Sequence, residues 1–497
     1  MTIANREGLA ALEARLKDDL QLLELPAKPW VHTSYRSGQP VSDVIIMGAG
    51  MCGLVAAASL KLLGIDNVIC LDKAPAGQEG PWKTFARMET LRSPKHLAGP
   101  ALGLPALTFR AWYQAQFGHE AWELLDKIPR TQWMDYLVWF RSVLELPVMN
   151  NTEVTLLQPN TDGLIAVDTR DMLTGETLRR YARRVVLASG RDGLGGPYVP
   201  DFVRSLDKQF WAHSADDIDF SALKGKRIGV IGAGASAMDN AATALEQGAK
   251  QVDMFIRRQD IPRINKFTGI SSQGVVQGFV GLSDEWKWRF ILSTLSAQTP
   301  PPRDSTLRVS RHANAFFHLG SPVTALDIKP DEIVLHTPTG TWALDFLIFA
   351  TGFQIDLAHR EELRLFSPYI KQWHDVFTPE RGQENGELAT SPYLGPSFEF
   401  QQKIVGQSPW LSHLYCFNYP SVLTHGKLSG DIPAVSAGGD RLAQGIARSL
   451  FVEDREKHYA DLLAFDTPEL FGDEWRNAER DVNPASDITS SQRNAHE

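Results

Sequence analysis

Cysteine is scarce in this sequence. Among 497 residues there are three, Cys52, Cys70 and Cys416, and no two of them form a C-x-x-C pair. This usage is typical of a reducing cytoplasm and argues against structural disulfides or a metal cluster. It also excludes the dithiol that a flavoprotein of the thioredoxin-reductase type requires. We therefore expect a cytoplasmic protein without a redox dithiol.

Long apolar stretches and an excess of basic charge are also missing. No run approaches the roughly 20 apolar residues needed to span a bilayer. The net charge of −9, without a basic stripe, argues against a nucleic-acid partner. Residues 1–25 place charges between helically spaced apolar residues, which predicts an amphipathic helix and not a secretory signal. With 43% hydrophobic residues, we expect a soluble protein of two domains with no membrane partner.

The first informative pattern is a strand, a glycine-rich turn and a helix. Gly48, Gly50 and Gly53 follow a buried strand, and the next apolar run ends in Asp72 and Lys73. Such glycines permit a tight turn and let the backbone approach a diphosphate at the helix N-terminus. The acid at the end of the second strand accepts hydrogen bonds from ribose hydroxyls. We interpret this unit as the FAD site; the alternative is a glycine-rich turn without a ligand.

The same pattern returns later in the chain with a different ending. Its loop contains Gly232, Gly234, Ser236 and Ala237, with alanine in the place of the third glycine, and the following strand ends in Arg257 and Arg258. Guanidinium groups at this position bind a ribose 2′-phosphate. NADPH is therefore favoured over NADH, although the arginines would also suit a solvated loop. Two dinucleotide sites in one chain imply hydride transfer from NADPH to FAD.

Three further motifs accompany the glycine loops. They are Gly80-Pro81-Trp82, Ala188-Ser189-Gly190 and Ala350-Thr351-Gly352-Phe353. With them the chain resembles the class B flavoprotein monooxygenases, the flavin-containing, Baeyer-Villiger and N-hydroxylating enzymes. The resemblance implies that the last two motifs carry the chain out of the FAD domain and back, which adds Thr351 and Gly352 to the cofactor-binding residues. Trp82 is expected to border the flavin or the domain cleft, or else to be a packing residue.

The resemblance implies an α/β fold with two Rossmann-like dinucleotide-binding domains, in which the NADPH domain is inserted into the FAD domain. We expect an N-terminal helix and linker over residues 1–40, FAD-domain segments over 41–200 and 325–497, and the NADPH domain over 201–324. Residues 270–295 are expected to be mainly helical, and residues 332–336 and 344–353 to form a hairpin followed by a buried strand. A long helix is expected over 432–451. The turn at Asn418 and Tyr419 and the helix start at Gly430 and Asp431 are expected to close over the flavin.

The family's histidine fingerprint, which reads F-x-G-x-x-x-H, is only partly present. Asp207 and Gln209 occupy the places of its phenylalanine and glycine, and His213 alone matches. We expect His213 to be a hydrogen-bonding linker residue and not a catalytic base. Arg92 stands where flavin-containing monooxygenases carry an asparagine near the flavin. As the candidate catalytic residue, it either donates to the peroxide or to an anionic substrate, or it forms a structural ion pair.

The function implied by the resemblance is that of an NADPH-dependent FAD monooxygenase. Such an enzyme inserts one atom of O2 into a small-molecule substrate, through a flavin C4a-(hydro)peroxide, at a nitrogen, a sulfur or a carbonyl group. The alternative is an NAD(P)H-dependent flavin oxidase or reductase without oxygen insertion, and a nucleotide sensor is a third interpretation. A homodimer is possible, since the N-terminal helix would pack either on its own chain or on a second subunit.

Overall fold

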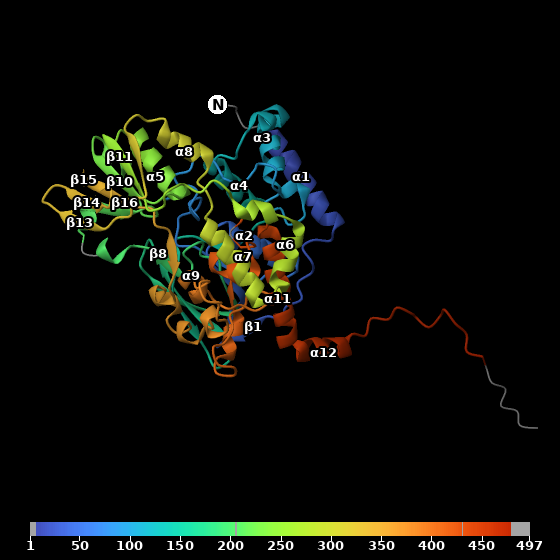
Figure 1. Cartoon of the computed structure of the whole chain (residues 1–497). Helices are drawn as coiled ribbons and strands as arrows, with labels where there is room; N and C mark the ends of the chain where they lie inside the picture. Colours follow the sequence, from blue (N-terminus) through green and yellow to red (C-terminus); the bar gives the residue numbers. More distant parts are fainter. Residues whose placement is uncertain (1–5, 204–205, 430, 479–497) are drawn as a thin grey trace, which may run out of the picture. The chain divides into compact units, whose positions relative to one another are not determined.

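The computed structural model describes residues 6–203, 206–429 and 431–478. These residues divide into two units, one ending at Glu453 and one beginning at Asp454, and Figure 1 traces both along the chain. The second unit contains α12, Arg455–Ala464. Within the described ranges, no helix is long and apolar enough to cross a membrane.

The larger sheet of the first unit is built from both ends of the chain. Its core is parallel, with β2 (Gln39–Met47) between β3 (Val68–Leu71) and β7 (Thr177–Leu187). The final half of β7 also pairs with the late strand β18 (Leu414–Cys416), in parallel. The remaining strands are β1 (Ser34–Arg36), β4 (Val148–Met149), β5 (Thr152–Pro159) and β6 (Ile165–Asp171).

A second, five-stranded sheet is entirely parallel and lies between β7 and β18 in the sequence. Its order is β12-β11-β10-β16-β9, and Figure 1 shows its central strands side by side. The strands are β9 (Trp211–His213), β10 (Arg227–Ile231), β11 (Gln251–Ile256), β12 (Ala315–Leu319) and β16 (Phe346–Phe349). This nesting confirms the expected α/β fold with one Rossmann-like unit inserted into the other. The boundary at residue 324 stays a prediction, and β16 follows it along the chain.

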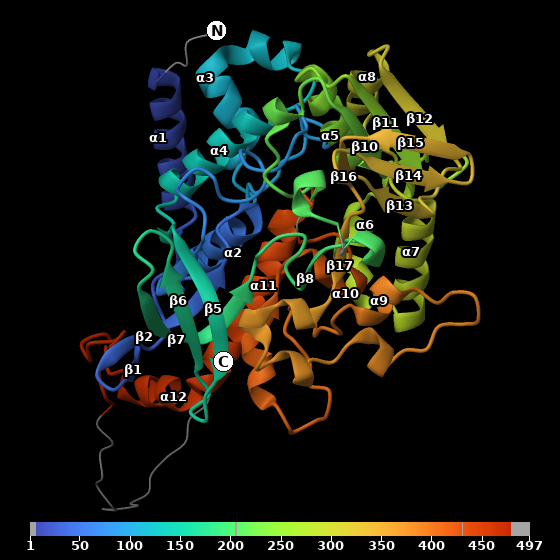
Figure 2. The same cartoon turned by 90° about the vertical axis from the view of Figure 1, so that its left-hand side faces the viewer.

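The helices that follow the two glycine loops are buried against these sheets. α2 (Met51–Leu62) is buried from Met51 to Leu60 because it is covered on both sides, by the sheet and by α11 (Val435–Glu453). α2 and α11 approach closely: a Cβ at Gly439 would lie 2.5 Å from Val55 Cγ1. Figure 2 shows the two helices near each other. The corresponding helix of the second sheet is α5 (Ala235–Glu246), which packs on α8 (Arg303–Ser310).

The N-terminal helix packs on its own chain. α1 (Arg6–Leu22) buries Leu12 and Leu16 and contacts α3 (Phe109–Leu124), while Glu13 accepts a hydrogen bond of 2.9 Å from Trp139 on α4 (Arg130–Val143). The tryptophan-rich region is therefore a packed aromatic core around these helices. Contact with a second subunit, the other expectation for this helix, stays a prediction.

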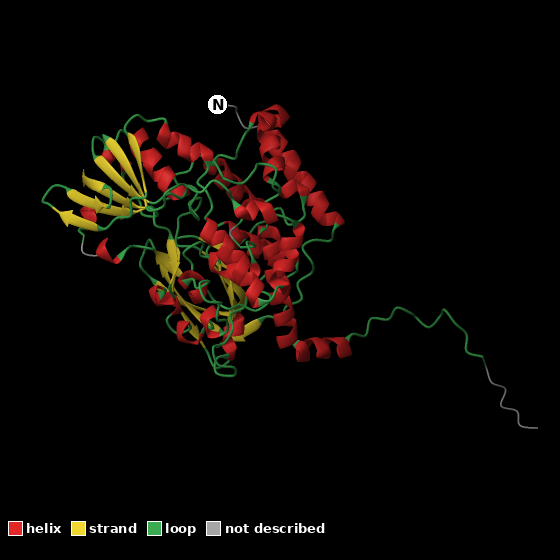
Figure 3. Ribbon diagram, viewed as in Figure 1, coloured by secondary structure: helices red, strands yellow, loops and turns green. Residues whose placement is uncertain are grey.

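Figure 3 shows how helix and strand are distributed over the molecule, and three expected regions differ from the prediction in detail. The run 344–353 is divided among three sheets, because its strands β15 (Gly340–Leu344), β16 and β17 (Phe353–Ile355) have different partners. The helix expected from residue 432 begins at Val435. The stretch 270–295 contains two helices, α6 (Gln273–Gly278) and α7 (Asp284–Ala297). The other described elements are β8 (Gly195–Pro197), β13 (Ala325–Ile328), β14 (Ile333–Thr337), α9 (Gly386–Thr390) and α10 (Val422–His425).

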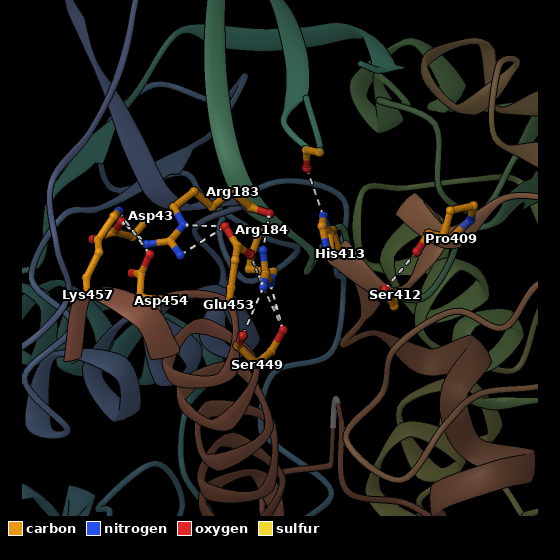
Figure 4. Close-up of polar contacts among 11 residues, drawn as sticks. Asp43, Arg183, Arg184, Pro409, Ser412, His413, Ser449, Glu453, Asp454 and Lys457 are labelled. Carbon is orange, nitrogen blue, oxygen red and sulfur yellow. Dashed lines mark hydrogen bonds and ion pairs between the residues drawn. The ribbon is translucent and has the colours of Figure 1, made fainter. Parts of the chain in front are cut away.

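Two buried arginines join β7 to the end of α11. Arg183 and Arg184 donate to opposite carboxylate oxygens of Glu453, at 2.9 and 2.6 Å, and Arg184 also binds Ser449 Oγ at 2.7 Å. Both arginine side chains are 1% exposed, and Figure 4 shows them converging on Glu453. Because a buried guanidinium needs a charged partner, this contact fixes the end of α11 against the larger sheet.

Candidate active site

The first glycine loop has no room for side chains at two of its positions. Gly48 has φ +104°, and a Cβ there would lie 2.6 Å from the carbonyl oxygen of Ala188. A Cβ at Gly53 would lie 1.9 Å from the carbonyl oxygen of Gly48. Gly50 is the N-cap of α2 and has no side chain to satisfy the first amides of that helix. The loop therefore presents bare backbone and a helix N-terminus, the arrangement that binds a diphosphate.

Asp72 braces this loop from the end of β3. Its carboxylate accepts hydrogen bonds from the backbone amides of Ala49, at 2.7 Å, and Ala74, at 2.8 Å. Each oxygen keeps a lone pair, so the expected ribose contact remains compatible with these bonds. Lys73, beside it, is exposed. The sequence pointed to Asp72 as a ligand-binding residue, and the structure adds that it also holds the loop in place.

The Gly80-Pro81-Trp82 motif lies against the same loop. A Cβ at Gly50 would be 3.8 Å from the Cα of Gly80. The Trp82 ring meets Trp133 edge-on, with 6.3 Å between the centroids, and the Trp82 carbonyl accepts a hydrogen bond from Arg130. Trp82 thus lies next to the candidate FAD loop and is also part of the aromatic packing.

The second glycine loop repeats the geometry of the first. Gly232 has φ +137°, and its Cβ would lie 2.6 Å from the Ala350 carbonyl oxygen. Gly234 is the N-cap of α5 and has open space around it. Ser236 is exposed in the first turn, while Ala237, in the place of a third glycine, is fully buried. A small residue at this place lets the helix pack closely on the sheet.

The two arginines after β11 lie at the edge of a pocket. Arg257 is exposed, and Arg258 donates a hydrogen bond of 3.1 Å to the Ser296 carbonyl. A pocket of about 340 Å³ is lined by Arg258, Arg263 and Lys266, with Asp260 as the acidic member. The stretch after the paired arginines therefore lines a predominantly cationic hollow. Its charge suits the 2′-phosphate of NADPH.

The outgoing and returning crossings between the two sheets lie side by side. β8 pairs with β17, and the Thr351 hydroxyl donates to the Tyr198 carbonyl. The Gly352 carbonyl accepts bonds from the Tyr198 amide, at 2.9 Å, and from His213 Nε2, at 3.0 Å. Burial lowers the pKa of His213, and its Nδ1 accepts from the Ala215 amide. His213 is thus a neutral residue that ties the crossings together, as the sequence predicted.

Arg92 lies at the surface and contacts the linker before α8. It is exposed, and its Nη2 donates to the carbonyl oxygen of Pro300. Partial burial lowers its pKa, while the charge of Asp239 opposes that shift. One of its two expected roles was to form a structural ion pair. Across the described ranges Arg92 forms none. A donor role toward substrate or oxygen stays a prediction.

The sequence did not identify two cations that lie near these crossings. Arg191 directly follows the Ala188-Ser189-Gly190 motif, and its guanidinium carbon is 4.3 Å from the centroid of Tyr419. Lys427 lies between the two flavin-closing turns expected from the sequence, with Nζ 3.7 Å from the ring centroid of Phe267. The signal in the sequence that could have identified both residues is their position next to recognised motifs. Gly430, part of the second turn, lies outside the described residues.

A buried neutral histidine fixes the segment that carries Lys427. Burial, followed by the charge of Arg441, lowers the pKa of His425 to about 3. Its Nε2 donates to the Gly395 carbonyl at 3.0 Å, its Nδ1 faces Arg441 Nη1 at 3.5 Å, and its ring stacks on Phe398 with 3.8 Å between the centroids. The residue is uncharged at neutral pH and has a positioning role.

The first loop region also contains buried polar atoms that fit a hydrogen-bonding cofactor. Among the described atoms, Ser189 Oγ and Asn418 Nδ2 are buried without a hydrogen-bond partner. Both face Gly193, whose Cβ would lie 2.7 Å from the first and 2.2 Å from the second. Buried polar atoms normally have partners. Together with the bare-backbone loop, they make this region a fitting cradle for a dinucleotide with a polar ring.

Residues 45–272 match the protein family described as pyridine nucleotide-disulphide oxidoreductase. An FAD-dependent urate hydroxylase from Xanthomonas campestris pv. campestris is 39% identical over 466 residues, which are 94% of this chain and 98% of that protein. Ornithine hydroxylase from Pseudomonas aeruginosa has a similar structure, with 18% identity, a TM-score of 0.65, and coverage of 82% of this chain and 100% of that chain. The ornithine N-hydroxylase of Kutzneria sp. 744, solved with reduced FAD, NADP⁺ and L-ornithine, shares 17% identity at a TM-score of 0.62, over 82% and 100% of the two chains.

Proposed function

We propose that this chain, which belongs to the class B flavoprotein monooxygenases, acts on urate or a closely related oxidised purine. The enzyme is an FAD- and NADPH-dependent monooxygenase. The observation that carries the purine proposal is the 39% identity to a urate hydroxylase over nearly the full length of both chains. The likeness to ornithine hydroxylases, at under 25% identity, supports the fold and not an amino-acid substrate.

The reaction adds one atom of O2 to the purine and reduces the other to water. NADPH supplies two electrons as hydride, and one proton from solvent completes the balance, so that hydroxylated purine, NADP⁺ and water are formed. FAD, when bound, transfers these electrons to O2. The oxidase or reductase alternative is not favoured, because the relative that matches nearly the whole chain is a hydroxylase.

We assign the residues of the two glycine loops to cofactor binding. The bare loop of Gly48, Gly50 and Gly53 would let the FAD diphosphate reach the amides at the start of α2, with Asp72 at its ribose. Gly232 and Gly234 would do the same for NADPH, with Arg257 and Arg258 at the 2′-phosphate. Support comes from the bare-backbone loops and from the cationic pocket beside Arg258. Lys73, Trp82, Ser236, Ala237, Thr351 and Gly352 border these sites and are proposed as supporting residues.

Three wider statements are also proposals. The NADPH domain occupies about residues 201–324, with β16 added to its sheet. The protein is cytoplasmic, which is supported by its few and buried cysteines. The proposal of a homodimer is supported only by the amphipathic character of the N-terminal helix.

Substrate-stimulated oxidation of NADPH tests the proposed function. The purified holoenzyme is mixed with NADPH and air, and NADPH loss and O2 uptake are followed with urate, xanthine, L-ornithine or L-lysine. Urate is expected to stimulate both rates, and a hydroxylated purine should accumulate in proportion to NADPH used. Stimulation by an amino acid and not by urate would overturn the purine proposal and leave the family assignment intact.

A further inference from the structure

Lys427 is a half-buried cation without a close acidic partner. Its Nζ lies 3.7 Å from the centroid of Phe267, and it makes no hydrogen bond or ion pair with any other described residue. Cations in such positions are costly unless an anion or an aromatic face compensates them. One aromatic face is present, and no carboxylate of the described residues forms an ion pair with Nζ.

Two arginines add to the positive charge around Lys427. Burial lowers the pKa of Lys427; Asp431 opposes this shift, and the charges of Arg191 and Arg92 add to it. Arg191 itself lies on the ring of Tyr419. Asp431 is the acid that acts on Lys427, and its own pKa is raised by burial, with Lys427 opposing. Three cations therefore face two acids, Asp431 beside Lys427 and Glu387 beside Arg191, and burial raises the pKa of both acids. The excess of positive charge is the electrostatic pattern of an anion site.

These groups come together where the two dinucleotide units meet. Arg191 follows the outgoing crossing and lies 5.9 Å from the ring centroid of Phe353 on the returning one. Phe267 belongs to the segment between β11 and α6, and Phe279 after α6 closes over Gly426, whose Cβ would lie 3.2 Å from its ring. In open α/β sheets, ligands bind beyond the carboxyl ends of the strands. Arg191 is therefore placed at the connection between the two candidate cofactor-binding units.

We propose that Lys427, together with Arg191, forms a subsite for the anionic edge of a planar heterocyclic substrate. The aromatic faces of Phe267 and Tyr419 would flank the flat ring, and Arg92 would add long-range attraction. Urate is a planar monoanion at neutral pH, so the inference rests on the proposed function and deepens it. The phosphates of FAD and NADPH have separate helix N-termini and the paired Arg257 and Arg258, which leaves Lys427 available for substrate.

The test replaces the Lys427 charge and measures substrate binding separately from turnover. Urate is titrated into the FAD-loaded enzyme without NADPH, in a calorimeter, for the wild type, K427M and K427R. Loss of one charge-assisted contact should raise the Kd of urate in K427M by about tenfold or more. K427R, which keeps the charge, should lie within a few-fold of the wild type. K329M removes an exposed lysine paired with Glu332 and is the matched control.

Cofactor measurements decide between a substrate subsite and a phosphate site. FAD content and the KM for NADPH should be unchanged in K427M if Lys427 binds substrate. An unchanged Kd for urate, or a raised KM for NADPH with normal urate binding, would overturn the proposal.

A second ligand separates this inference from the proposed function. If wild-type enzyme neither binds nor oxidises urate, the purine proposal fails, and benzoate, a simple planar anion, is titrated instead. Weaker benzoate binding in K427M than in the wild type and K329M would still support the anion subsite. Failure of the wild type to bind benzoate, or equal binding by all three proteins, would contradict it.

Discussion

At the residue scale, Asp72 has two functions that one substitution separates. Its carboxylate accepts two backbone amides of the loop region, so D72A should leave both unpaired and destabilise the protein by about 1–3 kcal/mol. The same change should sharply lower the flavin bound per chain. D72N keeps one acceptor oxygen, so its stability and its flavin content should lie between those of the wild type and D72A. Flavin absorbance and denaturant unfolding measure these effects, and full FAD content in D72A would refute the role at the ribose.

A second residue-scale prediction concerns the choice of nicotinamide cofactor. Removing the two guanidinium groups in R257A/R258A should raise the KM for NADPH by about tenfold to a hundredfold, because charge-assisted contacts to the 2′-phosphate are lost. The KM for NADH, which has no 2′-phosphate, should change little. Steady-state kinetics with both cofactors provide the comparison. An equal loss with NADH and NADPH would place the arginines in a structural role.

The pH dependence of substrate binding gives a third prediction. Burial lowers the pKa of Lys427, with the charges of Arg191 and Arg92 adding and Asp431 opposing. The ammonium therefore loses its proton at a lower pH than an exposed lysine, and urate binding should weaken as pH rises through that pKa. K427R should remove this alkaline limb, because arginine stays protonated. An identical limb in K427R would assign the titration to another group.

At the scale of elements, the contact between β7 and α11 predicts a pH-dependent stability. Burial raises the pKa of Glu453, but the charges of Arg184 and Arg183 outweigh it, and the net shift is downward. Its contribution is thus complete above the pKa of the unfolded state and is lost as pH falls through the folded pKa. Because the glutamate is 40% exposed, E453Q should cost about 2 kcal/mol at neutral pH, between exposed and buried pairs.

Unfolding in urea measures this effect at neutral and acidic pH. The difference between the wild type and E453Q should shrink in acid, where Glu453 is protonated. Glu456, 88% exposed and paired with Arg455, gives the control E456Q, which should change stability by less than about 1 kcal/mol. A constant difference at all pH values would contradict the account.

The elements themselves show what a sequence reveals about a fold. The strand-loop-helix units around Gly48 and Gly232 were predictable, because their glycines, apolar runs and terminal residues lie within a short stretch of chain. The hairpin and the buried strand expected over 332–353 are present as β14, β15 and β16, but apolar periodicity does not say which sheet each strand joins. The late start of α11 has a similar origin: Asp431 and Pro433 signal a helix start, yet Asp431 to Ala434 form a turn before Val435.

At the scale of the whole molecule, the candidate site could be predicted only in part. Cofactor loops are local motifs, but Arg92, Arg191 and Lys427 come from three distant segments, and only the folded chain brings their charges into mutual reach. The proposed substrate class likewise depends on similarity to a urate hydroxylase over 94% of this chain. The chemistry of the cofactors was thus readable from short patterns, while recognition of the substrate depends on tertiary structure.

Oxygen-isotope tracing of the product tests most directly whether this molecule is a purine monooxygenase. The holoenzyme is supplied with NADPH, urate and oxygen-18 gas, and the product is analysed by mass spectrometry while NADPH and hydrogen peroxide are quantified. We expect one labelled oxygen atom in each hydroxylated purine, one NADPH consumed per product, and little peroxide. Oxidation of NADPH with stoichiometric peroxide and no label in the purine would contradict this expectation.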